Sequence, residues 1–285
     1  MLAGSTGHAT PEYVAELRRA FGLDRPLWEQ FAIFVWRLVR LDLGYSFVHR
    51  QPVGTLVLER LGPTVLLMAT AIALAIALGV VAGVTAARHP RSWLDTLISV
   101  GALLVYATPA FWLGLMLIVL FSVRLDLLPS GGMEDVRGLL GMRRTLDILR
   151  HLVLPAVTLA LFYVAVYTRL MRAAMLEVSR LEYITAARAK GLGEGTVAWK
   201  HAARNALLPV VTLAGLQLGH LLGGSVLIET VFGWPGLGRL VFDALLQRDL
   251  NLLLGILFVS SVVVVLANLA VDLLYGLLDP RISQR

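Results

Sequence analysis

Polar and ionisable side chains inside long apolar stretches are the first candidates for chemistry in this sequence, because such groups usually serve a function there. His220 stands in the middle of one stretch beside Gln217, and Glu229 closes that stretch. Asn268 and Asp272 lie in the last one. No two of these residues form a clear proton relay, and no carboxylate stands in mid-stretch. The pattern therefore favours one hydrogen bond between helices for His220 over proton transfer or metal binding.

Enzymatic chemistry finds little support in the remainder of the chain. The sequence has no cysteine that could act as a nucleophile, and it contains no H-E-x-x-H zinc motif. It also lacks G-x-x-x-x-G-K-[ST], the loop that holds nucleotide phosphates. We therefore expect this chain to be no enzyme and no ATPase, and to hold no cofactor and no metal.

The polar segment 177–206 is the most informative part of the sequence. Ser179 and Glu182 fit a capping box, which predicts a helix from Glu182 that Gly191 ends with a left-handed turn. Two further glycines predict a turn before a second helix from Thr196. This segment could be an ordinary connector or a docking element that a cytoplasmic partner pushes and pulls.

The elements that position these residues follow from composition. Of 285 residues, 58% are hydrophobic and only 15% are charged, so a soluble domain could not cover its surface with polar groups. The chain has 25 Lys and Arg against 19 Asp and Glu, but these are scattered and form no basic stripe with interleaved aromatics. We therefore expect a protein of the lipid bilayer that binds no nucleic acid.

Intervals without charge predict the membrane spans. Five of them are long enough to cross a bilayer, and apolar runs of that length form helices. The fold expected is an all-α polytopic transmembrane helical bundle with spans near 64–87, 97–122, 152–172, 207–229 and 252–276. Positive charge groups 88–93, 169–204 and 277–285 on the cytoplasmic side. Five spans place the charged N-terminal segment outside, although nothing in the sequence explains how it crosses.

The residues before the first span differ from the others. Segment 1–61 is expected to be external and 62–285 to form the transmembrane domain. Asp24 can cap a helix whose first turn contains Pro26. Its apolar residues recur at helical spacing and are interrupted by charges, which indicates a helix on the bilayer surface. A helix packed on the bundle fits equally well.

Small residues and prolines indicate how the spans pack. One face of the first span carries small residues at four-residue spacing, and one face of the fourth does the same, which allows close helix packing. These residues are Ala71, Ala75, Gly79 and Gly83, and Gly215, Gly219 and Gly223. Whether their neighbours lie in this chain is left open. Pro109 should kink the second span, whereas Pro155 is expected near a helix start, where proline is tolerated.

Segment 182–192 and the following residues 201–209 resemble the EAA loop of binding-protein-dependent ABC permeases, most closely those of the dipeptide, oligopeptide and nickel branch. Four other parts of the chain resemble the same branch. They are ATPAFWLG at 107–114, ETVFGWPGLGR at 229–239, DLLYGLLDPR at 272–281, and the N-terminal GLDRPL at 22–27 with DLGYS at 42–46. Thr185 stands where the general motif has glutamate. The resemblance covers nearly the whole chain, except that the family's first span is missing before it.

The resemblance implies a type I ABC importer permease in the bacterial inner membrane, which forms half of a translocation path for peptides or related small solutes. Its expected partners are a second permease subunit, two cytoplasmic ATPase subunits and an external solute-binding protein. The residues expected to couple it to the ATPases are Glu182, Ala186, Ala187, Lys190, Gly191 and Leu192. An ion-coupled secondary transporter is the alternative, but the sequence shows neither repeated halves nor a mid-span carboxylate.

Overall fold

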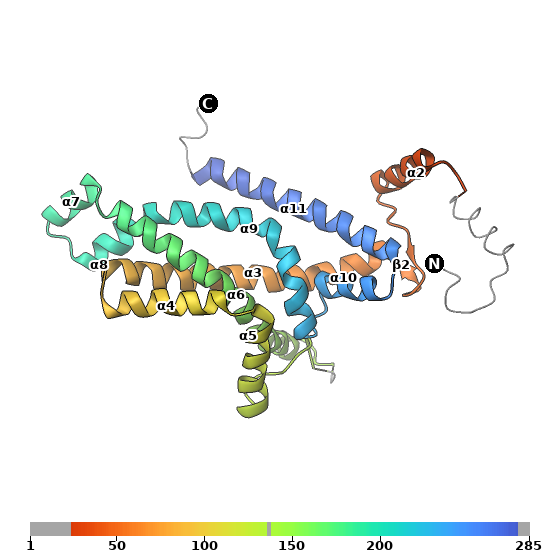
Figure 1. The fold of residues 1–285 in the computed structure, drawn as a ribbon, viewed down its shortest axis with the longest axis horizontal. Coiled ribbons are helices and arrows are strands. Elements are labelled where there is room, and N and C mark those ends of the chain that lie inside the picture. Colours follow the sequence, from red (N-terminus) through yellow and green to blue (C-terminus); the bar gives the residue numbers. More distant parts are fainter. Residues whose placement is uncertain (1–23, 136–137, 279–285) are drawn as a thin grey trace.

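The computed structural model describes residues 24–135 and 138–278, apart from the side chains of some residues in the last two long helices. The described residues are mostly helical, as expected, and they include one short β-hairpin (Figure 1). The elements are α2 (Leu27–Val39), β1 (Tyr45–Ser46), β2 (Gln51–Pro52), α3 (Val53–Arg88), α4 (Trp93–Ala107), α5 (Ala110–Leu117), the π-helix η1 (Ile118–Arg124), α6 (Met142–Val178), α7 (Glu182–Ala189), α8 (Glu194–Thr196), the π-helix η2 (Val197–Ala202), α9 (Ala203–Val231), α10 (Leu237–Leu246) and α11 (Leu250–Leu278).

The N-terminal helix α2 forms where its apolar spacing predicts it, but its start differs. The N-cap is Pro26 and no side chain caps the helix, so the cap predicted at Asp24 is wrong. No residue of α2 is buried, and its tryptophans Trp28 and Trp36 are 70% and 56% exposed. The expectation that α2 packs on the bundle is therefore wrong for the described part of the chain. The bilayer surface stays the prediction for its apolar face.

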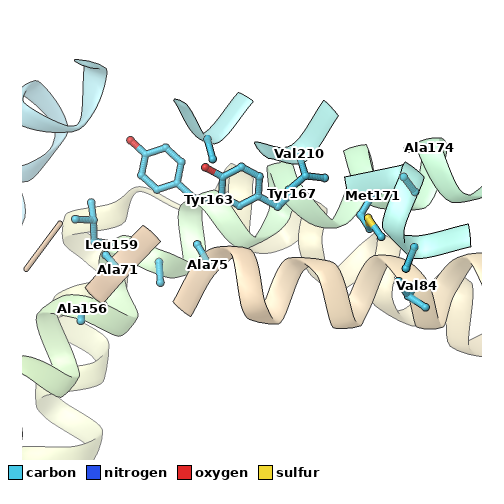
Figure 2. Packing of buried hydrophobic residues seen from close by; sticks show 14 of the residues in the cluster. Ala71, Ala75, Val84, Ala156, Leu159, Tyr163, Tyr167, Met171, Ala174 and Val210 are labelled. Atoms are coloured by element: carbon cyan, nitrogen blue, oxygen red, sulfur yellow. The ribbon is translucent and has the colours of Figure 1, made fainter. Parts of the chain in front are cut away.

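The pairing of α3 with α6 is the centre of the main core. A Cβ added at Gly79 would lie 2.6 Å from the Cβ of Tyr167, and one at Gly83 would lie 2.6 Å from the Cβ of Met171. The small face of α3 therefore contacts α6 of the same chain, which answers the question that the sequence left open (Figure 2). Close approach of this kind supplies the van der Waals contact that drives helix association in lipid. Gly219 and Gly223 of the second predicted small face lie outside the described residues.

The predicted span 97–122 is broken at Pro109, as expected. Helix α4 ends at Ala107, α5 begins at Ala110, and the two parts are bent by 102°. Proline removes a backbone donor and clashes with the preceding turn, which accounts for the break. Pro155, in contrast, lies well inside α6, because that helix already begins at Met142. The prediction of a helix start near Pro155 is wrong.

Among the described residues, three helices are long and apolar enough to cross a membrane, namely α3, α6 and α11. The bent pair α4–α5 raises this number to four if it forms one span. The fourth predicted span, 207–229, falls within α9, where several side chains are outside the described part. A total of five spans stays a prediction, and the domain boundary expected at residue 61 falls inside α3.

Different short elements lie at the two ends of the bundle. Helices α7 and α8 lie at one end of the long helices, near the turn between α3 and α4, while the hairpin and α10 lie at the other end (Figure 1). A second, smaller core joins the hairpin end, where the start of α3 packs against α10 and α11. The hydroxyl of Ser46 at this end donates to the buried carboxylate of Asp249. The sequence grouped 88–93 and 169–204 on one side, and residues from 87–90 and from 175–202 do line one cavity at this end.

Candidate functional site

Helix α7 forms where the sequence predicts a short helix, but it starts in another way. Its N-cap is Leu181, which is extended and makes no side-chain capping bond. The hydroxyl of Ser179 donates instead to the carbonyl oxygen of Leu176, 2.8 Å away. The predicted capping box is therefore wrong, and Glu182 acts in the first turn through its charge, which the helix dipole favours. The eight residues of α7 measure about 12 Å.

The end of α7 is a left-handed turn at Gly191, as predicted, and its hydrogen bonds form a Schellman motif. Gly191 has φ +77°, its N–H donates to the Arg188 carbonyl at 2.9 Å, and the Leu192 N–H reaches the Ala187 carbonyl at 3.4 Å. These two bonds satisfy carbonyls that the helix end would leave unpaired. Glycine adopts the left-handed conformation without the steric cost that a Cβ brings. The direction of the chain after α7 therefore depends on this residue.

Replacing Gly191 with valine should destabilise the protein by about 1–2 kcal/mol, because a β-branched residue is strained at positive φ. Thermal denaturation of the purified protein measures this as a lower midpoint. Gly193→Val is the matched control, since Gly193 has φ −63° and no atom lies within 4 Å of an added Cβ. Equal midpoints for the two variants would show that the turn does not need a left-handed residue.

The two faces of α7 differ in exposure. Ile184 is 0% and Ala187 is 7% exposed, and both belong to the main core. The other residues predicted to contact an ATPase lie on the outer face or just after the helix, and all of them are exposed. These are Glu182, Ala186, Lys190, Gly191 and Leu192. Ala187 is thus a packing residue within this chain and is not available to a partner.

Polar contacts fix α7 to the helices that follow it in the chain. The Tyr183 hydroxyl donates to the His201 carbonyl at 3.4 Å and accepts from Asn205 Nδ2 at 2.7 Å. Arg188 donates to Glu194 through Nε at 2.8 Å and Nη2 at 3.3 Å. The Arg188 hydrogen bond also lowers the pKa of the Glu194 carboxyl below its ordinary value. Sequence reasoning missed these contacts, although Tyr183 and Arg188 lie inside the segment it selected.

The second helix of this segment starts earlier than predicted and continues into the membrane helix. Gly193 is the N-cap of α8, and Gly195 lies inside α8, so the turn predicted at both glycines is wrong for Gly195. Helix α8 continues through η2 into α9 without an intervening loop. Helix α7 is therefore joined directly to α6 through residues 179–181 and to α9 through α8. Two long helices are therefore attached to the two ends of this short segment.

An ion pair with a buried carboxylate joins two helices at the same end of the bundle. Arg172 on α6 donates to both carboxylate oxygens of Asp95 on α4, at 2.6 and 2.8 Å. Asp95 is 5% exposed and also accepts from the N–H of Arg91 at 2.9 Å. Planar pairing of this kind adds geometric specificity. It fixes α4 to α6 close to the point where α6 leads into α7.

At the opposite end, the carboxylate of Glu229 joins three helices. Glu229 on α9 is fully buried, accepts from the Thr64 hydroxyl at 2.8 Å and from the Arg239 N–H at 3.0 Å. The Thr64 hydroxyl in turn accepts from the N–H of Leu237 at 2.7 Å. A negative charge at the first turn of α10 is favoured by the helix dipole. Glu229 is therefore a positioning residue, and its partner Thr64 carried no signal in the sequence.

Thr64→Val should lower the free energy of unfolding by about 1–3 kcal/mol, because it leaves the Leu237 N–H and part of the Glu229 carboxylate without a partner. Thermal denaturation in detergent measures the loss. Thr64→Ser should restore the midpoint. Thr70→Val is the control, because that exposed hydroxyl only donates to the Leu66 carbonyl of its own helix. A Thr64→Val midpoint equal to that of Thr70→Val would contradict the bridging role.

The other polar candidates are distributed as follows. Gln217 accepts a hydrogen bond from the Tyr167 hydroxyl at 2.7 Å, which links α9 to α6. Asn268 is exposed on α11, and the side chains of His220 and Asp272 lie outside the described residues. Within the described part of the chain, no group of three or more His, Cys, Asp or Glu side chains could hold a metal ion.

Comparison with known proteins agrees with this arrangement. The family model of the binding-protein-dependent transport system inner membrane component matches residues 79–284. The chain is 40% identical to the dipeptide transport system permease protein DppB of Escherichia coli K12, over 100% of this chain and 89% of that protein. It is 41% identical to the oligopeptide transport system permease protein AppB of Bacillus subtilis 168, over 92% and 83%.

Among solved structures, the fold is similar to that of the MetNI methionine ABC transporter in an inward-facing conformation. The TM-score is 0.65 at 19% identity, with 80% of this chain and 98% of that chain covered. Family match, relatives and fold agree with an all-α polytopic permease. The chain therefore belongs to the family of binding-protein-dependent transport system inner membrane components, and it is a permease subunit of an ABC importer.

Proposed function

We propose that this chain forms one half of a heterodimeric path for peptides or related small solutes across the bacterial inner membrane. An external binding protein delivers the solute, and two separate cytoplasmic ATPase subunits supply the energy. The names of the relatives support peptide as the substrate class. The observation that carries the proposal is α7, a short helix with an exposed outer face that is anchored by its inner face to the bundle.

In this proposal the ATPase contacts the outer face of α7 through Glu182, Ala186, Lys190 and the Gly191–Leu192 turn. Closure of the ATPase dimer around ATP displaces α7. The buried Ile184 and the Tyr183–Asn205 hydrogen bond pass that displacement to the bundle. Since α7 is joined to α6 by residues 179–181 and to α9 through α8 and η2, the two long helices respond together and the path alternates between its two orientations. Such a change is a two-state equilibrium biased by a ligand bound elsewhere.

Uptake by the assembled transporter tests the proposal. The chain is co-expressed with a second permease subunit, the ATPase subunits and the binding protein of the same transporter, and the complex is purified and reconstituted into vesicles containing ATP. We expect uptake of a radiolabelled dipeptide that requires ATP and is unaffected by ionophores. Uptake without ATP that an ionophore abolishes would overturn the proposal in favour of an ion-coupled secondary transporter.

A further inference from the structure

Arg169 on α6 is an unusual charge for a membrane helix. It is exposed, and its guanidinium carbon lies 5.1 Å from the centroid of the Tyr106 ring on α4. Asp95, the acid at the start of α4, is occupied by Arg172 through both of its oxygens. Within the described residues, Arg169 forms no ion pair with an acidic side chain. A cation–π contact is its one charge-stabilising interaction recorded in that part of the chain.

The backbone position of Arg169 lies within the apolar part of the bundle. The neighbouring residue Thr168 packs against Gly79 and Gly83 of α3, where added Cβ atoms would approach its backbone to 3.2 and 2.8 Å. These glycines precede Arg88, the charged residue that ends α3, by nine and five residues. At 1.5 Å per residue, Arg169 is therefore about 8–14 Å inside that end.

The side chain of Arg169 extends further inward. Tyr106 follows Asp95 by eleven residues along α4, which corresponds to about 16 Å, or roughly half the thickness of the hydrocarbon core. Arginines near a helix end usually extend toward the water interface. Arg169 instead lies against a ring deep in the apolar layer. A guanidinium at that depth must face a water-filled space or a polar partner, because exposure to lipid is too costly.

The backbone next to Tyr106 is irregular as well. The ring stacks on Phe162 of α6 with centroids 5.2 Å apart, so it is held in place. Directly after it, the chain leaves the helix at Thr108 and Pro109 and turns by 102°. Non-helical backbone at membrane depth is tolerated only where it is buried in protein or lines a water-filled cavity. The charge of Arg169 and the irregular backbone at Thr108 and Pro109 therefore both lie next to Tyr106.

We propose that Arg169, seated on Tyr106 beside the α4–α5 break, binds the terminal carboxylate of the substrate as it crosses the permease. A guanidinium presents N–H donors in a planar fork that fits a carboxylate. The aromatic ring attracts the cation but supplies no negative charge, so the site is completed by an anion from outside the chain. This inference rests on the proposed function, since it takes peptides as the substrate class.

Transport of a peptide with a free carboxylate and of its C-terminal amide tests the inference. Both are measured in vesicles with the complete transporter carrying wild-type chain, Arg169→Gln, Arg169→Lys or Arg150→Gln. Arg150 is the matched control, an exposed arginine on the same helix but outside the predicted span. We expect Arg169→Gln to reduce uptake of the free acid at least tenfold, Arg169→Lys to retain much of it, and Arg150→Gln to equal wild type.

The ratio of free-acid to amide uptake is the readout that a structural role would not change. We expect this ratio to fall at least fivefold from wild type to Arg169→Gln. Any preference of the binding protein for the free acid is the same in the two transporters, so it does not change the comparison. An unchanged ratio would overturn the inference. Loss of the second permease subunit on purification of Arg169→Gln would also overturn it, by assigning Arg169 to the subunit interface. A wild-type transporter that moves no peptide would instead refute the proposed function.

Discussion

Gly83→Val is expected to remove most of the protein from the membrane. A Cβ at Gly83 would lie 2.6 Å from the Cβ of Met171 and 2.8 Å from the carbonyl oxygen of Thr168. Backbone cannot yield as a flexible side chain can, so α3 and α6 must separate along the face on which the main core is built. Because overpacking of a well-packed core alone costs about 1–3 kcal/mol and lost helix contact adds to it, we expect at least a tenfold drop in membrane level.

Quantitative immunoblotting of membranes measures this drop. Gly101→Val on α4 is the matched control, because no atom lies within 4 Å of a Cβ added there. It makes the same chemical change in another apolar helix and should keep near-normal levels. Normal abundance of Gly83→Val would mean that the two helices do not pack as closely as the structure shows.

Ala186→Trp is expected to stop transport while leaving the protein in the membrane. Ala186 is exposed on the outer face of α7, so the larger side chain disturbs no packing within the chain. In the proposed arrangement it would hold the ATPase away from α7. Solute uptake should fall at least tenfold, and less ATPase should co-purify with the variant.

Ala32→Trp is the control for an added exposed tryptophan, since Ala32 lies on the outward helix α2. Ala187→Trp serves as a contrast. That residue is 7% exposed in the main core, so its variant should lose membrane level as well as transport. Full uptake by Ala186→Trp would show that α7 only connects its neighbouring helices and does not contact the ATPase.

Local chemistry explains which features could be predicted from the sequence. Long intervals without charge indicated the apolar helices, because a chain segment that crosses a bilayer must satisfy its backbone hydrogen bonds internally, as a helix does. Gly191 was predicted at positive φ and Pro109 at a break, because each residue type has a strong conformational preference of its own. The capping box failed because Ser179 can satisfy its hydroxyl within the preceding helix. The start of α6 was missed because polar residues such as Arg143 and Arg150 continue a helix beyond the apolar run.

Contacts between distant segments explain the remaining differences. The partners Thr64 and Glu229 are 165 residues apart, and Asp95 and Arg172 are 77 apart. Neither pair leaves a periodic signal in one sequence. The inward face of α7 did leave one, since Ile184 and Ala187 are three residues apart on one side of a polar helix. That spacing separates Ala187 from the exposed residues that are predicted to contact the ATPase.

Cross-linking from α7 tests the central claim most directly. The chain contains no cysteine, so Ala186→Cys provides its one thiol for a photoreactive maleimide probe, in a transporter whose other subunits have their cysteines replaced by serine. Val48→Cys, an exposed position near the hairpin at the opposite end, is the control. The account predicts that the probe at position 186 forms an adduct with the ATPase subunit and that the probe at position 48 forms none. Absence of the adduct from position 186, with full labelling of the thiol and intact assembly, would contradict it.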